Sequence, residues 1–220
     1  MRATSATRET LLQVAREQML GGGYEGASID RICRQAGVSK GGFFHYFRSK
    51  EELALAVLEH HLQRSAAAFA GAPFLEQPEP LQRLLGYADF TATLCQDPVR
   101  DGCMVGLLSQ EVSGTHPVIR QACAAAFDQW AGQLELMLEQ AIRLHAPHAG
   151  LDARSLAEHF IAVFEGALIL ARARHSAAPV RDGLEHYRRY LTALLAEKPG
   201  ARRTAPGQRR SRTPATRRTP

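Results

Sequence analysis

One segment restricts the fold of this chain more than any other feature. Residues 28–53 read as two short helices joined by a glycine turn, followed by the start of a third helix. Ser28 can cap the first helix, in which apolar residues recur at three- and four-residue spacing. Gly37 stands where a tight turn needs a left-handed backbone, and Ser39 can cap the second helix. The Ser-x-x-Glu pattern of residues 49–52 predicts the start of the third. Two helices joined by a short glycine-containing turn are typical of the helix-turn-helix that binds DNA.

Charge is distributed unevenly along the chain. Residues 1–50 carry eight basic and four acidic side chains, whereas residues 51–197 carry eleven basic and eighteen acidic ones. An acidic middle would repel DNA, so we expect the nucleic-acid surface within residues 1–50. Residues 198–220 carry eight basic side chains and no acidic one. This segment lacks apolar periodicity, so we predict a disordered basic tail that is either a solubilising extension or an arm with non-specific DNA affinity.

The pattern between these ends predicts an all-α fold. No stretch alternates as a strand would, and Pro and Gly mark the breaks between helical segments. We expect a domain of residues 1–50, a second domain of residues 51–197 and the tail of residues 198–220. The expected helices of the second domain cover residues 51–70, 81–96, 104–112, 117–145, about 153–175 and 180–197.

The remaining bulk features favour a cytoplasmic protein. Four cysteines without CxxC spacing are typical of free thiols in a reducing compartment. The start of the chain lacks the apolar run of a signal peptide, and the longest apolar stretch, residues 163–171, is shorter than the roughly 20 residues that cross a bilayer. No His, Cys or Asp cluster has metal-ligand spacing, so we expect no metal and no cofactor.

Residues 8–53 resemble the DNA-binding domain of the TetR family of bacterial transcription regulators. The matching residues keep their spacing over the whole segment: Arg8, Leu11, Leu12, Ala15, Gly23, Tyr24, Ser28, Ile29, Ile32, Ala36, Gly37, Val38, Ser39, Phe47, Lys50 and Leu53. The resemblance implies a three-helix DNA-binding head and a body of about six helices that binds a small-molecule effector and forms a homodimer through its last two helices. It further implies a repressor that binds a palindromic double-stranded DNA operator and is released by an inducer.

The same resemblance, carried over by position, implies a set of DNA contacts. The expected DNA-binding residues are Ser28, Ser39, Lys40, Gly41, Gly42, His45, Tyr46 and Lys50. Lys40 and His45 can donate to base edges or phosphates, and Gly42 leaves room for a thymine methyl group. Ser28 and Lys50 resemble phosphate clamps at helix amino termini. Phe44 stands where the family usually has a tyrosine, so the phosphate contact of that hydroxyl is lost.

Residues 101–113 resemble a subgroup of the family that includes the repressor of the N-ethylmaleimide reductase operon, which senses electrophiles through a cysteine at the place of Cys103. Arg172 takes the place of a lysine near that thiol, and a nearby cation would favour the reactive thiolate. Two hypotheses stay open: reversible binding of an apolar or aromatic effector, or thiol chemistry at Cys103 with Cys95 as a resolving partner. The expected cavity lining is Phe90, Leu94, Cys103, Met104, Leu107, Phe127, Trp130, Leu134, Met137 and Phe164.

Two further function classes need consideration. Cys103 with one of the histidines at positions 116, 145, 148 and 159 could form a hydrolase site, but no catalytic signature surrounds this cysteine, so we expect no enzyme. An architectural DNA-binding protein without an effector is the other alternative. A body without a cavity would support it.

Overall fold

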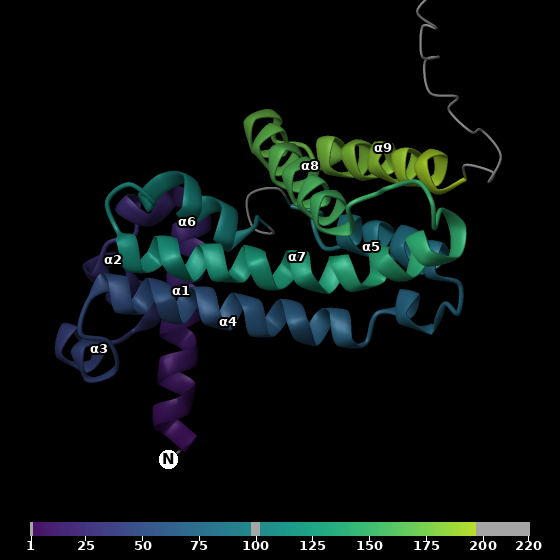
Figure 1. The fold of residues 1–220 in the computed structure, drawn as a ribbon. Coiled ribbons are helices and arrows are strands. Elements are labelled where there is room, and N and C mark those ends of the chain that lie inside the picture. The colour runs from purple at the N-terminus through teal and green to yellow at the C-terminus, as the bar shows by residue number, and fades with distance from the viewer. Residues whose placement is uncertain (1, 98–101, 197–220) are drawn as a thin grey trace, which may run out of the picture.

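The computed structural model describes residues 2–97 and 102–196, which form α-helices and one 3-10 turn (Figure 1). No strand occurs in these two ranges, and the all-α prediction is confirmed. The predicted tail of residues 198–220 lies outside them. The elements are α1 (Arg2–Gly26), α2 (Ile29–Ala36), α3 (Lys40–Tyr46), α4 (Lys50–Ala70), η1 (Pro73–Glu76), α5 (Pro80–Thr93), α6 (Met104–Val112), α7 (Pro117–His145), α8 (Ala153–Arg174) and α9 (Ala178–Leu195).

Helices α1 to α3 form the head at one end of the molecule (Figure 1). Ser28 Oγ accepts a hydrogen bond from the Arg31 backbone N–H at 3.3 Å, which caps α2. Gly37 ends α2 with φ of 67°, the left-handed conformation that the turn requires. Ser39 Oγ accepts from the Gly42 N–H at 3.0 Å and caps α3. The local structure of the helix-turn-helix is therefore the one that the sequence predicts.

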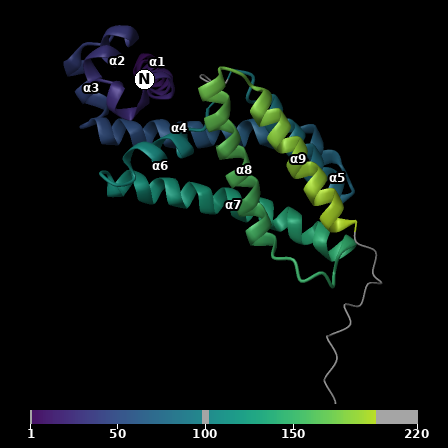
Figure 2. The same ribbon diagram turned by 90° about the horizontal axis from the view of Figure 1, so that it is seen from above.

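Helix α4 connects the head to the body. It begins at the predicted cap, where Ser49 Oγ accepts from the Glu52 N–H at 3.0 Å. Its first turns pack in the head, and its later turns run beside α7 (Figure 1). Helix α8 packs on α7, and α9 packs on both α8 and α5 (Figure 2). Within the described ranges, no helix is both long and apolar enough to span a membrane.

Two apolar cores fill the molecule, and they do not divide at residue 50. One core lies among α5, the later turns of α7, α8 and α9. The other contains the head helices together with Leu53 and Val57 of α4, Met104 and Leu108 of α6, and the first turns of α7. Helix α6 therefore belongs to the core of the head, although it follows a loop of the body in sequence.

Candidate functional site

The exposed face of α3 is the candidate DNA interface. Phe43 and Phe47 are buried and hold the helix to the head. Five residues of the expected DNA-binding set are exposed: Ser28, Ser39, Lys40, Gly41 and His45. Phe44 is 48% exposed on the same helix, an unusual position for a large apolar side chain. Gly42 and Tyr46 are partly buried.

The two glycines of α3 differ in their surroundings. A Cβ atom on Gly42 would lie 3.0 Å from Val38 Cγ1 and 3.2 Å from Ser39 Oγ, so a larger residue there would make one of these side chains shift by a few tenths of an ångström. A Cβ atom on Gly41 would meet nothing within 4 Å. Gly42 was the glycine expected to leave room for a thymine methyl group, but only at Gly41 is the space of a side chain left open by the protein itself.

Lys50 is held inside the head rather than projecting freely. Its Nζ lies 3.6 Å from Glu25 Oε2 and 4.2 Å from the centre of the Tyr24 ring, and it donates to the Glu25 carbonyl at 3.4 Å. Lys40 Nζ forms an ion pair with Asp30 Oδ1 at 3.0 Å, with both side chains more than half exposed. Such an exposed pair contributes little to stability, so Lys40 can exchange Asp30 for another anion.

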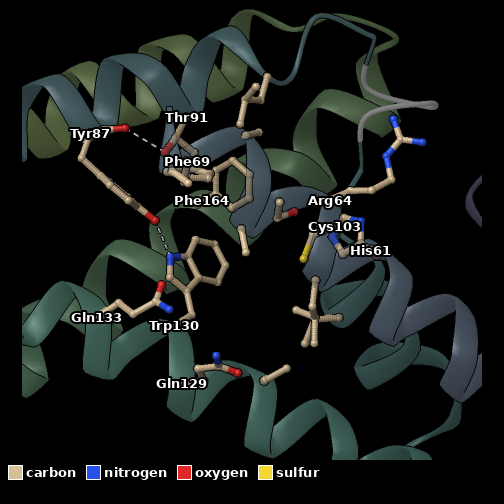
Figure 3. Close-up of a pocket in the computed structure, with 18 of the residues that line it drawn as sticks. His61, Arg64, Phe69, Tyr87, Thr91, Cys103, Gln129, Trp130, Gln133 and Phe164 are labelled. Atoms are coloured by element: carbon tan, nitrogen blue, oxygen red, sulfur yellow. Dashed lines mark hydrogen bonds between the residues drawn. The ribbon is translucent and has the colours of Figure 1, made fainter. Parts of the chain in front are cut away.

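A cavity of about 590 Å³ lies in the body between α4, α5, α7 and α8, with the start of α6 at one end (Figure 3). Its size is within the range of small-molecule sites. Trp130 Nε1 donates a hydrogen bond to the Tyr87 hydroxyl at 2.6 Å, and Phe69 and Phe164 lie beside this pair. This observation disfavours the architectural alternative, which required a body without a cavity.

Half of the expected lining residues reach the cavity. Leu94, Cys103, Trp130, Met137 and Phe164 line it. The other expected residues are placed elsewhere. Met104 is fully buried in the core of the head, where Leu107 and Phe127 also pack, and Phe90 and Leu134 pack in the core of the body. Met104 and Leu107 lie away from the cavity because most of the apolar surface of α6 packs in the core of the head, although Val105 of the same helix lines the cavity.

Several polar lining residues were not expected from the sequence. Helix α4 contributes His61 and Arg64, helix α1 contributes Arg16, and α7 contributes Gln129 and Gln133. On α4 these residues stand among Gln, Ser and Ala, a composition typical of a solvent-facing surface. The sequence therefore contained no signal that could separate them from ordinary exposed residues.

Cys103 is the residue before α6 and faces the cavity beside His61 (Figure 3). Its thiol donates a hydrogen bond to the carboxylate of Glu165 on α8. Burial and, next, the charge of Glu165 raise the pKa of the thiol well above its ordinary value. Burial also raises the pKa of Glu165 to about 7, and its Oε1 atom is buried without a hydrogen-bond partner among the described residues.

Arg172, which the resemblance placed near this thiol, lies elsewhere. Arg172 does not line the cavity; its guanidinium donates to the backbone carbonyl of Leu20 at 2.5 Å. A carboxyl group takes the place near the thiol that the resemblance gave to a cation. The resting side chain of Cys103 is the protonated thiol.

Helix α6 connects the cavity to the head. Glu111, near its end, accepts hydrogen bonds from the backbone N–H groups of Tyr24 at 2.6 Å and Glu25 at 2.9 Å. These donors follow Gly23, where α1 is kinked with φ of 80° and ψ of 168°. One end of α6 thus reaches the cavity through Cys103, and the other end contacts the head through Glu111.

Three of the four histidines considered for a hydrolase site contact other residues, and the fourth, His148, is exposed. His116 lies 3.4 Å from the Tyr24 hydroxyl, His145 lies 2.5 Å from Glu79 Oε1, and His159 packs against Tyr187 and Tyr190. All four cysteines are free thiols, and Cys95 also lines the cavity. Among the described residues, no group of three His, Cys, Asp or Glu side chains could hold a metal ion.

Comparison with known proteins supports the division into head and body. A family model for bacterial regulatory proteins of the tetR family matches residues 11–57, and one for the tetracyclin repressor-like C-terminal domain matches residues 80–187. The chain belongs to the TetR family. This TetR-family chain is a DNA-binding transcription regulator with a helix-turn-helix head, and the expectation of a regulator rather than an enzyme is confirmed.

Individual relatives cover most of this TetR-family chain. The transcriptional regulator AcuR of Cereibacter sphaeroides is 26% identical over 194 residues, which are 88% of this chain and 89% of AcuR. The HTH-type transcriptional repressor NemR of Escherichia coli is 28% identical over 190 residues, 84% of this chain and 94% of NemR. The crystal structure of a TetR regulator from Chloroflexus aurantiacus has a TM-score of 0.78 at 28% identity, covering 87% of this chain and 97% of that one.

Proposed function

We propose that this protein is a homodimeric repressor that binds a palindromic operator in the bacterial cytoplasm and is released when a small molecule occupies the cavity of its body. The observation that carries the proposal is the cavity of about 590 Å³, whose wall includes the residue that starts α6. A family member without such a site would have no place for an effector. The relative NemR is named a transcriptional repressor, which supports repression rather than activation for this protein.

The head would read DNA with the exposed face of α3. Ser39, Lys40 and Gly41 stand at the start of this helix, the part that enters the major groove in helix-turn-helix proteins. His45 follows one turn later, and Phe44 offers an apolar contact to a thymine methyl group or a sugar. Ser28, at the amino terminus of α2, would bind a phosphate without specifying sequence.

The coupling between cavity and head would pass through α6. An effector can act only if it binds one arrangement of the head better than the other. A ligand that pushes on Cys103 would shift α6, and Glu111 would transmit the shift to α1 at the Gly23 kink. In a dimer, this movement would change the distance between the two heads and so the fit to an operator with fixed half-site spacing.

The dimer surface is proposed on α8 and α9. Ile169 and Leu170 on α8 and Tyr190 on α9 are each more than 40% exposed in the single chain. Large apolar side chains gathered on adjacent helices are typical of surfaces that another protein covers. Pairing of these two helices with their counterparts in a second copy would bury them.

A second candidate function rests on Cys103. The thiol faces the cavity, and Glu165 is placed to accept its proton, so an electrophile held there could react with it. In such an addition an S–C bond forms, the activated C=C bond becomes a single bond, and the thiol proton ends on carbon. The raised pKa of the thiol makes this reaction slow at neutral pH, and reversible binding is the function that the geometry supports better.

The test of the main proposal is selection of the operator from random double-stranded DNA, followed by sedimentation of the protein with the selected site. We expect an inverted repeat and two chains per site. Arg143→Gln, an exposed change in the last turn of α7 and outside the head, α8 and α9, serves as a control for Lys40→Gln. Binding of a single chain, or retention of no common sequence, would contradict the proposal.

A further inference from the structure

One end of the cavity is basic. Among the described residues, those that line it include two arginines and a histidine but no aspartate or glutamate: Arg16 from α1, His61 and Arg64 from α4. His61 and Arg64 are three residues apart and therefore share a face of α4. Basic side chains from two helices thus stand together at one end of the cavity wall.

The opposite end is aromatic. Trp130 and Tyr87 lie across the cavity from Cys103 and His61 (Figure 3). Phe69 and Phe164 complete this end, and Gln129 and Gln133 supply neutral polar groups on α7. A molecule that matches both ends has an apolar body and one anionic group.

The protonation state of His61 is consistent with an anion-binding end of the cavity. Burial first, then the charges of Arg16, Arg64 and His60, lower the pKa of His61 to about 4. The imidazole is therefore neutral at pH 7 and can donate one ring N–H, while the two guanidinium groups keep their charge. Guanidinium groups bind carboxylates by paired, charge-assisted hydrogen bonds, which suit a planar carboxylate well.

We propose that the cavity binds an amphipathic organic monocarboxylate, with its carboxylate among Arg16, His61 and Arg64 and its apolar body against Trp130 and Tyr87. This inference rests on the proposed function, because it names the chemical class of the effector that the cavity takes. It also gives a reason for coupling: Arg16 belongs to the head, and His61 and Arg64 belong to the helix that enters the body. A carboxylate bound both by Arg16 of α1 and by His61 and Arg64 of α4 would favour one placement of α1 relative to α4.

The test uses matched pairs of acid and amide. The probes are straight-chain, phenyl-substituted and naphthyl-substituted monocarboxylates, such as 3-phenylpropanoate, each paired with its neutral amide of the same shape. Trp130 is the single tryptophan of the chain, so its fluorescence reports occupancy of the cavity without DNA. Titration calorimetry gives the affinity independently.

We expect at least one acid to bind about tenfold or more tightly than its amide, the scale of a charge-assisted hydrogen bond. Arg64→Gln and Arg16→Gln should each remove most of that preference, whereas Arg174→Gln, on α8 and outside the cavity, should keep it. Thermal unfolding of each variant shows whether it is folded. Met137→Ala, at the apolar wall, should weaken acid and amide equally.

Three results would overturn the inference. These are equal binding of acid and amide, a preference that survives both arginine substitutions, and failure of every acid in the panel to bind. Failure of the proposed function looks different: an acid that binds with the expected preference and leaves operator affinity unchanged would retain the carboxylate site and reject its role in release.

Discussion

The carboxylate of Glu111 accepts a hydrogen bond from the backbone N–H of Tyr24 at 2.6 Å, across 87 positions of sequence. With the second bond to the Glu25 N–H, this contact attaches α6 to the kink of α1. Both donors belong to backbone that no longer continues the helix before Gly23. Glu111 thus satisfies donors that the kink would leave without helical partners.

Gly23→Ala should destabilise the protein. Its φ of 80° and ψ of 168° are a conformation that essentially only glycine adopts, and an added Cβ would lie 2.7 Å from Glu111 Oε1. We expect the free energy of unfolding to fall by roughly 1–3 kcal/mol, measured by urea denaturation. Gly22→Ala is the matched control, because a Cβ there meets nothing within 4 Å. Equal losses for both variants would contradict this reading of the kink.

Glu111→Gln should loosen the head from α6. The substituted amide can accept from one of the two backbone donors, but its NH₂ group cannot accept from the other. We expect a loss of about 1–3 kcal/mol and faster hydrogen exchange in peptides that contain Tyr24 and Glu25. Exchange as slow as in the unsubstituted protein would show that α6 does not hold the kink.

Glu165→Gln should change the pH dependence of stability. Because the pKa of Glu165 is raised to about 7, the folded state binds this proton more tightly than the unfolded state, and stability falls as pH rises from about 4.5 to 7. A glutamine side chain does not titrate, so the variant does not lose stability in this way as the pH rises. Its free energy of unfolding relative to the unsubstituted protein should therefore increase between about pH 5 and pH 7.5, by at most roughly 3 kcal/mol. His61 titrates in both proteins and cancels in the difference. A difference independent of pH would contradict burial of the Glu165 carboxyl.

Gly41→Ala and Gly42→Ala should separate DNA recognition from folding. The first substitution adds a methyl group to the exposed face of α3 and should leave stability equal or slightly higher. It should weaken operator binding by about tenfold, the scale of one lost base contact. Gly42→Ala forces Val38 or Ser39 to move, so it should lower the melting temperature. Undiminished operator affinity in Gly41→Ala would exclude close approach of α3 to DNA at this position.

The sequence predicted the helices well because their ends carry local signals. Pro117 opens α7, Asp152 caps α8, and the glycine turn at Gly37 separates α2 from α3. Each signal acts within a few residues of the helix end that it marks. The bounds of α6 and α7 are those expected from these signals.

The cavity was predicted only in part, because its wall depends on how helices rotate against one another. Met104 and Leu107 are apolar residues of α6, as a lining residue would be, yet they pack against the head. Arg172 reaches Leu20 across 152 positions, a contact that no local pattern encodes. Arg64 and His61 line the cavity from a helix face that reads as polar surface.

If occupancy of the cavity controls DNA binding, alkylation of Cys103 should release the operator. A small maleimide attached to this thiol occupies the cavity at the start of α6, whatever the natural effector is. The measurement is the dissociation constant for the selected operator before and after labelling, with mass spectrometry to confirm the labelled residue and Cys103→Ser as the control. We expect the dissociation constant to rise about tenfold or more in the unsubstituted protein and to stay unchanged in Cys103→Ser. Complete labelling at Cys103 with an unchanged operator dissociation constant would contradict it.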